Sequence, residues 1–274
     1  MLTRSLLFVP ALRPERVAKA VAAGADIVCI DLEDSVAPDR KADGRRMAIE
    51  ALHAAPPGAT IAVRINPIRG DDGPRDAAAL AAAGAKPAYV VLPKIDGATD
   101  IAETWQRLGS AAVPIIAIVE TALALENATE IARAAAPDGF LFFGAMDLSA
   151  ELGCALEWEP LIYARGRIIQ AAACAGTGAM DTPYPDIADE AGARAEAQRA
   201  RSFGFTGKAA IHPKHIAGIH AAFTPSAEEI AWAKRVRDAM AQSSGVLQLD
   251  GKMIDRPVVR SAERVLEVAR RLGL

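Results

Sequence analysis

The sequence predicts an α/β fold of the (β/α)8 TIM-barrel type, and three observations support this prediction. A chain of 274 residues fits one large α/β domain or two small ones. Short apolar runs alternate with longer Ala-rich segments of helical period, which is typical of parallel strands joined by helices. The runs are apolar on both faces, so the sheet is either covered by helices or closed on itself.

Eight apolar runs are predicted to be strands, and eight such units match a barrel of roughly 250 residues. The runs are 5–9, 26–33, 60–66, 88–94, 114–120, 139–147, 178–183 and 207–213. The helices predicted between them include 72–84, 98–109, 121–136, 158–175 and 187–203. In the alternative, an open doubly wound sheet, the first strand would normally lead into a Gly-rich phosphate turn, but the turn here is VPALRPE.

The pattern changes after residue 223, which predicts a barrel domain at 1–223 and a C-terminal helical extension at 224–274. Ser226 and Glu229 are spaced as a capping box at the start of a helix. A Gly-bearing turn or hairpin, SSGVLQLDGKMIDRP, precedes an amphipathic helix, PVVRSAERVLEVARRL. The extension is too short to be a domain. We therefore expect an arm or lid that packs on its own barrel or on a neighbouring one.

The composition excludes several classes of protein. A formal net charge of −3 argues against a general nucleic-acid-binding surface but leaves room for a local basic pocket. Three cysteines without CxxC spacing argue against a disulfide framework or a zinc site, and they fit a reducing cytoplasm. Of these, Cys29 lies in an apolar run and is expected to pack as a small hydrophobe. No window approaches the apolar length of a membrane span.

Charged or polar residues stand at the ends of the predicted strands. They are Asp31, Glu33 and Asp34, Arg64 and Asn66, Lys94, Glu120, Asp147, Asp181 and His212. In a barrel of this kind the carboxyl ends of the strands form the active face. We therefore expect these acids and bases to form a polar pocket above an apolar barrel.

Glu120 and Asp147 end consecutive predicted strands, so their carboxylates are expected to be neighbours. Mg²⁺ is often held by one or two carboxylates, with water or substrate at its other positions. The spacing alone favours two alternatives equally: a metal site of this kind, or ion pairs of these carboxylates with Arg64 or Lys94. Arg64 presents a planar fork suited to a carboxylate or a polarised carbonyl. His212 lies directly before a proline, and a histidine in such a place makes a structural contact more often than it acts as a base.

Motifs along nearly the whole chain resemble the citrate lyase β-subunit-like (CitE-like) family of the HpcH/HpaI aldolase superfamily, which includes malyl-CoA and citramalyl-CoA lyases. The motifs are RSLLFVPA, DLEDSVAPDRK, VRIN, LPKI, IVETALALENA, FGAMDLSAELG, GFTGKAAIHPKHI and GKMIDRP. The resemblance implies a TIM barrel that binds Mg²⁺ and cleaves or forms a C–C bond next to a CoA or acyl-carrier thioester. It also implies a homo-oligomer, a trimer or a hexamer.

The resemblance also implies roles for matching residues. Glu120 and Asp147 take the places of the metal ligands, and Arg64 takes the place that steadies the reacting oxygens. Asp255 takes the place of an acid/base carboxylate on the C-terminal arm. Glu33 and Asp34 are expected to orient Arg64 and metal-bound water. Lys94 is assigned to substrate binding together with Arg64 and Glu120.

The chain departs from the family pattern at two positions, Ala11 and Ala124, where glycine is common. Ala124 is expected near the keto-acid group, where it would narrow the pocket. The function implied is cleavage of a 3-hydroxyacyl-CoA thioester such as malyl-CoA or citramalyl-CoA into a 2-oxo acid and an acyl-CoA. The alternatives are a citryl-thioester lyase subunit working with an acyl-carrier protein, an HpcH-type aldolase on free 2-oxo acids, and a malyl-CoA thioesterase.

Overall fold

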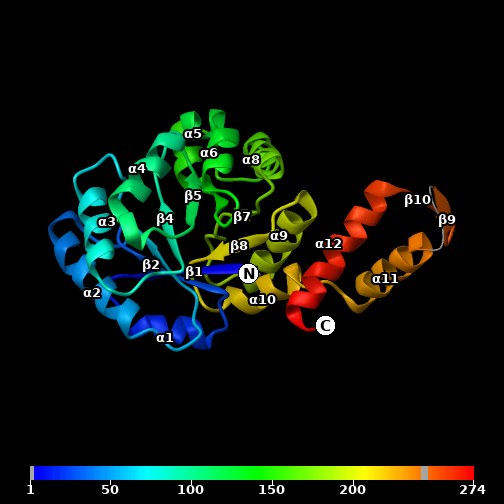
Figure 1. Cartoon of the computed structure of the whole chain (residues 1–274), viewed down its shortest axis with the longest axis horizontal. Helices are drawn as coiled ribbons and strands as arrows, with labels where there is room; N and C mark the ends of the chain where they lie inside the picture. The colour runs from blue at the N-terminus through cyan, green and yellow to red at the C-terminus, as the bar shows by residue number, and fades with distance from the viewer. Residues whose placement is uncertain (1–2, 242–245) are drawn as a thin grey trace. The chain divides into compact units, whose positions relative to one another are not determined.

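The structure, a computed structural model, describes residues 3–241 and 246–274. Within Thr3–Ile219 eight parallel strands form a closed barrel in chain order, and β8 pairs back to β1 (Figure 1). The strands are β1 (Ser5–Pro10), β2 (Ile27–Asp31), β3 (Ile61–Arg64), β4 (Tyr89–Leu92), β5 (Ile115–Val119), β6 (Phe140–Phe143), β7 (Ala179–Asp181) and β8 (Gly207–Ala210). The predicted (β/α)8 fold is confirmed.

Helices surround the barrel in Figure 1 and cover the outward faces of its strands. They are α1 (Glu15–Ala22), α2 (Lys41–His53), α3 (Asp72–Ala82), α4 (Ala98–Leu108), α5 (Ala122–Glu126), α6 (Ala128–Ala135), α7 (Ala145–Leu152), α8 (Ile162–Ala175) and α9 (Glu190–Phe203), with short 3₁₀ turns at Pro38–Arg40 and Gly109–Ala111. Every second residue of a strand points into the barrel. In β2 these residues are Ile27 and Cys29, which belong to the interior apolar cluster, so Cys29 packs as predicted.

Two elements differ from the sequence-based prediction. The run 139–147 was expected to be one strand, but β6 ends at Phe143 and α7 begins at Ala145. Asp147 therefore lies in the first turn of a helix and not at a strand end. The predicted helix 121–136 is divided into α5 and α6 at Asn127, whose side-chain amide donates to the carbonyl oxygen of Asp96 at 2.7 Å.

The chain divides into two compact units at Ile219, inside α10 (His215–Phe223). The second unit contains α11 (Ala227–Ala241), a hairpin of β9 (Leu247–Leu249) and β10 (Lys252–Ile254), and α12 (Arg256–Leu272). The first residues of the predicted hairpin segment, 243–245, and residues 1–2 lie outside the described residues.

The predicted capping box opens α11. Ser226 Oγ accepts from the Glu229 backbone N–H at 3.1 Å, and the Glu229 carboxylate accepts from the Ser226 N–H at 2.7 Å. The unit has an apolar core of its own, which includes Val236, Ile254 and Ala262. In the described part of the chain no helix combines the length and the apolarity that crossing a membrane requires.

Candidate active site

A cavity of about 730 Å³ opens at the carboxyl ends of the barrel strands. Its polar lining includes Asp31, Asp34, Arg64, Glu120 and Asp147. Apolar side chains of the barrel interior, among them Phe8, Ile118 and Phe142, complete the lining. The cavity thus combines an apolar base with charged walls, as expected for a small-molecule site. Ala124, by contrast, is fully buried in α5 and does not line the cavity, so it does not narrow it.

Asp31 and Arg64 form a two-pronged ion pair between the ends of β2 and β3. Arg64 Nε donates to Asp31 Oδ1 at 2.7 Å, and Nη2 donates to Oδ2 at 2.9 Å. The register of the parallel pair sets Asp31 beside Arg64, so the contact follows directly from the pairing of β2 with β3. The guanidinium carbon lies 4.8 Å from the centre of the Phe8 ring, which supports the guanidinium from β1.

The Asp31 carboxylate is held charged despite its burial. It also accepts the backbone N–H groups of Glu33 at 3.0 Å and Ser35 at 3.1 Å. Burial would raise the pKa of Asp31, but the hydrogen bonds and the charge of Arg64 outweigh this effect, and the pKa lies below its usual value. Asp31 is therefore a fixed anion that locks the orientation of Arg64.

Glu33 and Asp34 contact the same guanidinium. Arg64 Nη1 lies 2.8 Å from Glu33 Oε2, and Nη2 lies 3.5 Å from Asp34 Oδ2. Glu33 is buried, and burial raises its pKa to about 8 against the attraction of Arg64. Asp34 is the more peripheral of the two, because its side chain is 65% exposed. Both residues lie where the sequence placed them, next to Arg64, although it is Asp31 that accepts two hydrogen bonds from the guanidinium.

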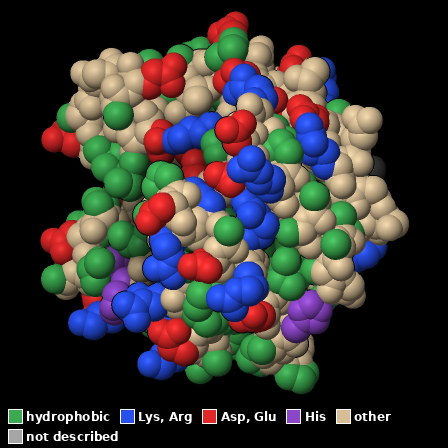
Figure 2. Space-filling view, turned by 90° about the vertical axis from the view of Figure 1, so that its left-hand side faces the viewer, with side chains coloured by type: hydrophobic (Ala, Val, Ile, Leu, Met, Phe, Trp, Pro, Cys, Tyr) green, Lys and Arg blue, Asp and Glu red, His purple; other side chains and the backbone are tan. Residues whose placement is uncertain are grey.

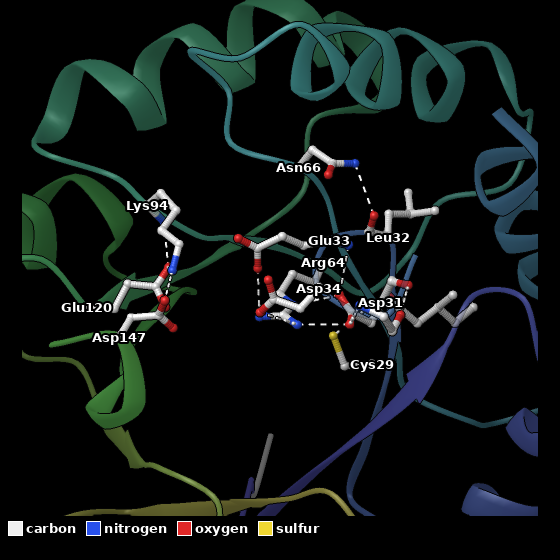
Figure 3. Close-up of polar contacts among 12 residues, drawn as sticks. Cys29, Asp31, Leu32, Glu33, Asp34, Arg64, Asn66, Lys94, Glu120 and Asp147 are labelled. Atoms are coloured by element: carbon white, nitrogen blue, oxygen red, sulfur yellow. Dashed lines mark hydrogen bonds and ion pairs between the residues drawn. The ribbon is translucent and has the colours of Figure 1, made fainter. Parts of the chain in front are cut away.

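A second charged group lies across the cavity from Arg64 (Figure 3). It consists of Glu120 and Asp147, which line the cavity, and of Lys94, which pairs with both. The Lys94 backbone N–H donates to Glu120 Oε1 at 2.6 Å, and the Lys94 ammonium group lies 3.8 Å from the same oxygen. The ammonium group also ion-pairs with Asp147 Oδ1. The predicted neighbourhood of the two carboxylates is thus present, and so is the predicted ion pair with Lys94.

Burial and charge act in opposite directions on this group. Burial raises the pKa of Glu120 to about 7, against the attraction of the Lys94 charge and of its backbone N–H. Burial lowers the pKa of Lys94, but the hydrogen bond to Asp147 and the charge of Glu120 outweigh it and raise that pKa. The Lys94 ammonium therefore stays protonated between the two acids.

Gly144 makes room for the Glu120 carboxylate. A Cβ atom at position 144 would lie 2.3 Å from the Cβ and 2.7 Å from the Oε2 of Glu120. These separations are shorter than any tolerated contact, so a larger residue would displace the carboxylate. The same glycine ends β6, and α7 then presents Asp147 toward Lys94.

The two carboxylates fit a divalent cation. Among the described residues no group of three or more His, Cys, Asp or Glu side chains is gathered into a complete metal cage. Mg²⁺ does not require one, because it usually takes one or two carboxylates and keeps water or substrate oxygens as its other ligands. The Lys94 ammonium group ion-pairs with both Glu120 and Asp147, so the two carboxylates can face one cation. These residues suit Mg²⁺ in donor type and in charge.

Two cations of α1, Arg16 and Lys19, also line the cavity and were not singled out from the sequence. Both are exposed, and no other side chain in the described part of the chain pairs with them. The side of the molecule that carries α1, α2 and α3 in Figure 1 is turned to the viewer in Figure 2, where Lys and Arg side chains gather among Asp and Glu. Arg16 and Lys19 are three residues apart, which places both on one side of a helix, and this spacing was the signal in the sequence that could have identified them.

Asp181 does not belong to this cavity, contrary to the expectation from the strand ends. Met180 points into the barrel, so Asp181, the next residue of β7, points outward. There it pairs with Lys208 at 2.8 Å and with Arg165 at 3.3 Å, and all three side chains are buried. The group ties β7 and β8 to α8. His212 lines the cavity, and its Nδ1 accepts the backbone N–H of Lys214 at 3.2 Å.

Asp255 belongs to the C-terminal unit. It is the N-cap of α12, where Oδ1 accepts the backbone N–H of Val258 at 3.2 Å. Its other carboxylate oxygen accepts no hydrogen bond from the described residues. One oxygen therefore has a structural duty, and the other is available.

Family models match the chain over almost its whole length. The model of the HpcH/HpaI aldolase/citrate lyase family matches residues 4–213. The chain belongs to this family. A second model, C-C bond lyase of the TIM-barrel fold, matches residues 168–274 and so includes the C-terminal unit. The predicted family and the predicted class of enzyme, a carbon–carbon lyase, are both confirmed.

Members of the HpcH/HpaI aldolase/citrate lyase family with assigned names resemble the chain from end to end. The citrate lyase subunit beta-like protein of Mycobacterium tuberculosis is 39% identical over 272 residues, which is 96% of this chain and 94% of that protein. The L-malyl-CoA/beta-methylmalyl-CoA lyase of Cereibacter sphaeroides is 31% identical, over 97% of this chain and 94% of that one. The crystal structure of CitE from M. tuberculosis in complex with magnesium, acetoacetate and coenzyme A has a TM-score of 0.83 and 36% identity, and covers 98% of both chains.

Proposed function

We propose that the chain is a Mg²⁺-dependent lyase that cleaves a 3-hydroxyacyl-CoA thioester, such as malyl-CoA or citramalyl-CoA, into a 2-oxo acid and an acyl-CoA, or forms the same bond in reverse. The observation that carries the proposal is the pairing of two groups in one cavity. Two carboxylates around a cation, Glu120 and Asp147, face an arginine whose charge is fixed by Asp31. The similarity to a magnesium and coenzyme A complex supports the choice of metal and thioester.

Cleavage requires charge stabilisation at each end of the bond. The 3-hydroxyl group loses its proton, the bond between C2 and C3 breaks, and its electron pair passes to the thioester enolate, which then takes up a proton at carbon. Glu120 and Asp147 would hold the metal, which when bound supplies a Lewis acid for the hydroxyl group and the adjacent carboxylate. Both carboxylates line the cavity, so a metal held by them would face the substrate.

Arg64 suits the enolate oxygen. A guanidinium has five N–H donors. Three of them make contacts of 2.9 Å or less with Asp31 and Glu33. The remaining donors can bind an oxyanion without reorganisation, because the carboxylates already hold the guanidinium plane in place.

Arg16 and Lys19 suit the phosphates of coenzyme A. Both are exposed cations that line the cavity without an acidic partner among the described residues. They attract an anionic carrier, whereas the apolar side chains of the cavity accept the thioester arm. This arrangement favours a CoA thioester over a small free acid, because a free 2-oxo acid has no group that reaches a second cationic patch.

Asp255 is proposed as the acid/base that protonates the enolate carbon, delivered by the C-terminal arm in a homo-oligomer. The free carboxylate oxygen and the position of Asp255 on a turn between β10 and α12 support this role. A carboxyl group placed beside the reacting carbon can transfer a proton as a general acid or base.

A panel of thioesters tests the proposal. Malyl-, methylmalyl-, citramalyl- and citryl-CoA, and citryl-loaded acyl-carrier protein, are each incubated with the purified chain and Mg²⁺, and the products are identified by mass spectrometry. We expect a 2-oxo acid and an acyl-CoA from at least one CoA thioester. Turnover of the carrier-bound thioester alone would instead assign a lyase subunit, and release of free CoA alone would assign a thioesterase.

A further inference from the structure

Lys94 has a backbone conformation that is rare for its residue type. It has a φ of +50°, and within the described part of the barrel it is the one residue other than glycine with a positive φ. The conformation costs free energy in a residue with a Cβ, and such residues persist where the surrounding contacts hold them. Lys94 directly follows Pro93, just beyond β4.

Contacts on three sides fix this conformation. The backbone N–H of Lys94 donates to Glu120 Oε1 at 2.6 Å, and its carbonyl oxygen accepts from Arg69 Nη2 at 2.8 Å. Arg69 is held in turn by ion pairs with Asp96 and Asp100. The left-handed turn is therefore built into the loops after β3 and β4, and the side chain of Lys94 leaves it toward Asp147 (Figure 3).

The ammonium group of Lys94 balances the charges of Glu120 and Asp147. In the described part of the chain, Glu120 and Asp147 each form an ion pair with Lys94 and with no other basic side chain. Glu120 is buried, so its charge is costly without a partner. The ammonium group supplies that partner.

We propose that Lys94 is an internal counter-cation: in the metal-free protein its ammonium group holds the place between Glu120 and Asp147, and it must leave that place when Mg²⁺ binds. The inference rests on the proposed metal site and goes beyond it, because it assigns to Lys94 control of metal affinity in addition to any contact with substrate. Lys94 then keeps the two carboxylates close together and lowers the affinity of the site for Mg²⁺.

Equilibrium binding of Mg²⁺ to the full chain, measured by isothermal titration calorimetry without substrate, tests this. Lys94→Met keeps the length of the side chain and removes its charge. Lys94→Asn removes the charge with a residue that tolerates positive φ, so it controls for backbone strain. We expect the Kd for Mg²⁺ to fall about tenfold in both variants, since a hydrogen-bonded charge pair no longer competes with the metal.

Lys86→Met is the matched control. Lys86 is exposed and donates to the carbonyl oxygen of Ser110, away from the cavity, so its replacement removes the same charge without touching the site. Its Kd for Mg²⁺ is expected to equal that of the wild type. The rise in Tm on adding Mg²⁺ should also be larger in both Lys94 variants than in Lys86→Met, because tighter binding to the folded state stabilises it more.

An unchanged or a higher Kd in the folded Lys94 variants would overturn the inference and leave the metal site intact. If the Glu120→Gln variant binds Mg²⁺ as tightly as the wild type, the proposed metal site is overturned as well. The two failures are distinguishable because the first leaves wild-type binding dependent on Glu120, and the second does not.

Discussion

Replacing Arg64 by lysine separates a catalytic role of the guanidinium from a structural one. Arg64 makes two hydrogen bonds to Asp31 at 2.7 and 2.9 Å and an ion pair with Glu33 at 2.8 Å, and it lies over the ring of Phe8. Lysine keeps the charge but offers a single ammonium group in place of the planar fork. It can replace one of the contacts to Asp31 but not the two-pronged geometry.

The structure sets the size of both expected effects. The Arg64 side chain is only 12% exposed, so the loss of one well-formed charged hydrogen bond is expected to cost about 2 kcal/mol of stability. In a domain of this size that lowers Tm by roughly 4–8 °C. Loss of an oriented donor to the enolate oxygen is expected to reduce kcat by about 10²–10³-fold. The Kd for Mg²⁺ should not change, because Arg64 does not contact Glu120 or Asp147.

Arg45→Lys provides the matched control. Arg45 also binds two carboxylates, Asp76 at 2.7 Å and Asp72 at 2.9 Å, and its side chain is 16% exposed, but it does not line the cavity. We expect a similar loss of Tm and an unchanged kcat. Thermal melts and steady-state kinetics on both variants make the comparison. If Arg64→Lys kept the wild-type kcat while losing as much Tm as Arg45→Lys, Arg64 would be a structural partner and not a catalytic residue.

Three further predictions concern Asp31, Gly144 and Asp255. The pKa of Asp31 is lowered in the folded state, so its ion pair with Arg64 stabilises the fold above the usual pKa of an aspartate, and this stability is lost as the pH falls. Asp31→Asn should therefore flatten the acid limb of a plot of unfolding free energy against pH, and an unaltered limb would contradict this. Gly144→Ala should displace the Glu120 carboxylate by overpacking and weaken Mg²⁺ binding at least tenfold, as measured by calorimetry. An unchanged affinity would refute the close approach of Gly144 to Glu120. Mixed oligomers of inactive Asp255→Ala and inactive Glu120→Ala subunits should regain activity if the arm serves a neighbouring barrel, and verified mixed oligomers without recovery would exclude a shared site.

The apolar runs predicted the barrel because strands buried on both faces leave a strong local signal. The same runs placed Arg64 and Glu120 correctly, since Arg64 is the last paired residue of β3 and Glu120 follows the last paired residue of β5. Asp147 was misplaced because the apolar run continues through Gly144 into α7, whereas β6 ends at Phe143.

Other features required the three-dimensional arrangement. The partnership of Asp31 with Arg64 joins residues 33 positions apart and depends on the register of β2 against β3. The place of Lys19 at the cavity depends on how α1 packs on the barrel. The outward direction of Asp181, by contrast, was accessible from the sequence, because strict alternation along β7 sends it to the side opposite Met180.

Product analysis of one thioester tests the central claim most directly. The best substrate of the panel is incubated with the wild type in Mg²⁺, with the wild type in EDTA, and with Glu120→Gln in Mg²⁺, and the 2-oxo acid, the acyl-CoA and free CoA are all quantified. We expect the 2-oxo acid and the acyl-CoA in equal amounts from the wild type in Mg²⁺ and neither product in the other two reactions. Free CoA with an intact hydroxy acid, or equal turnover in EDTA, would contradict a metal-dependent carbon–carbon lyase built on Glu120, Asp147 and Arg64.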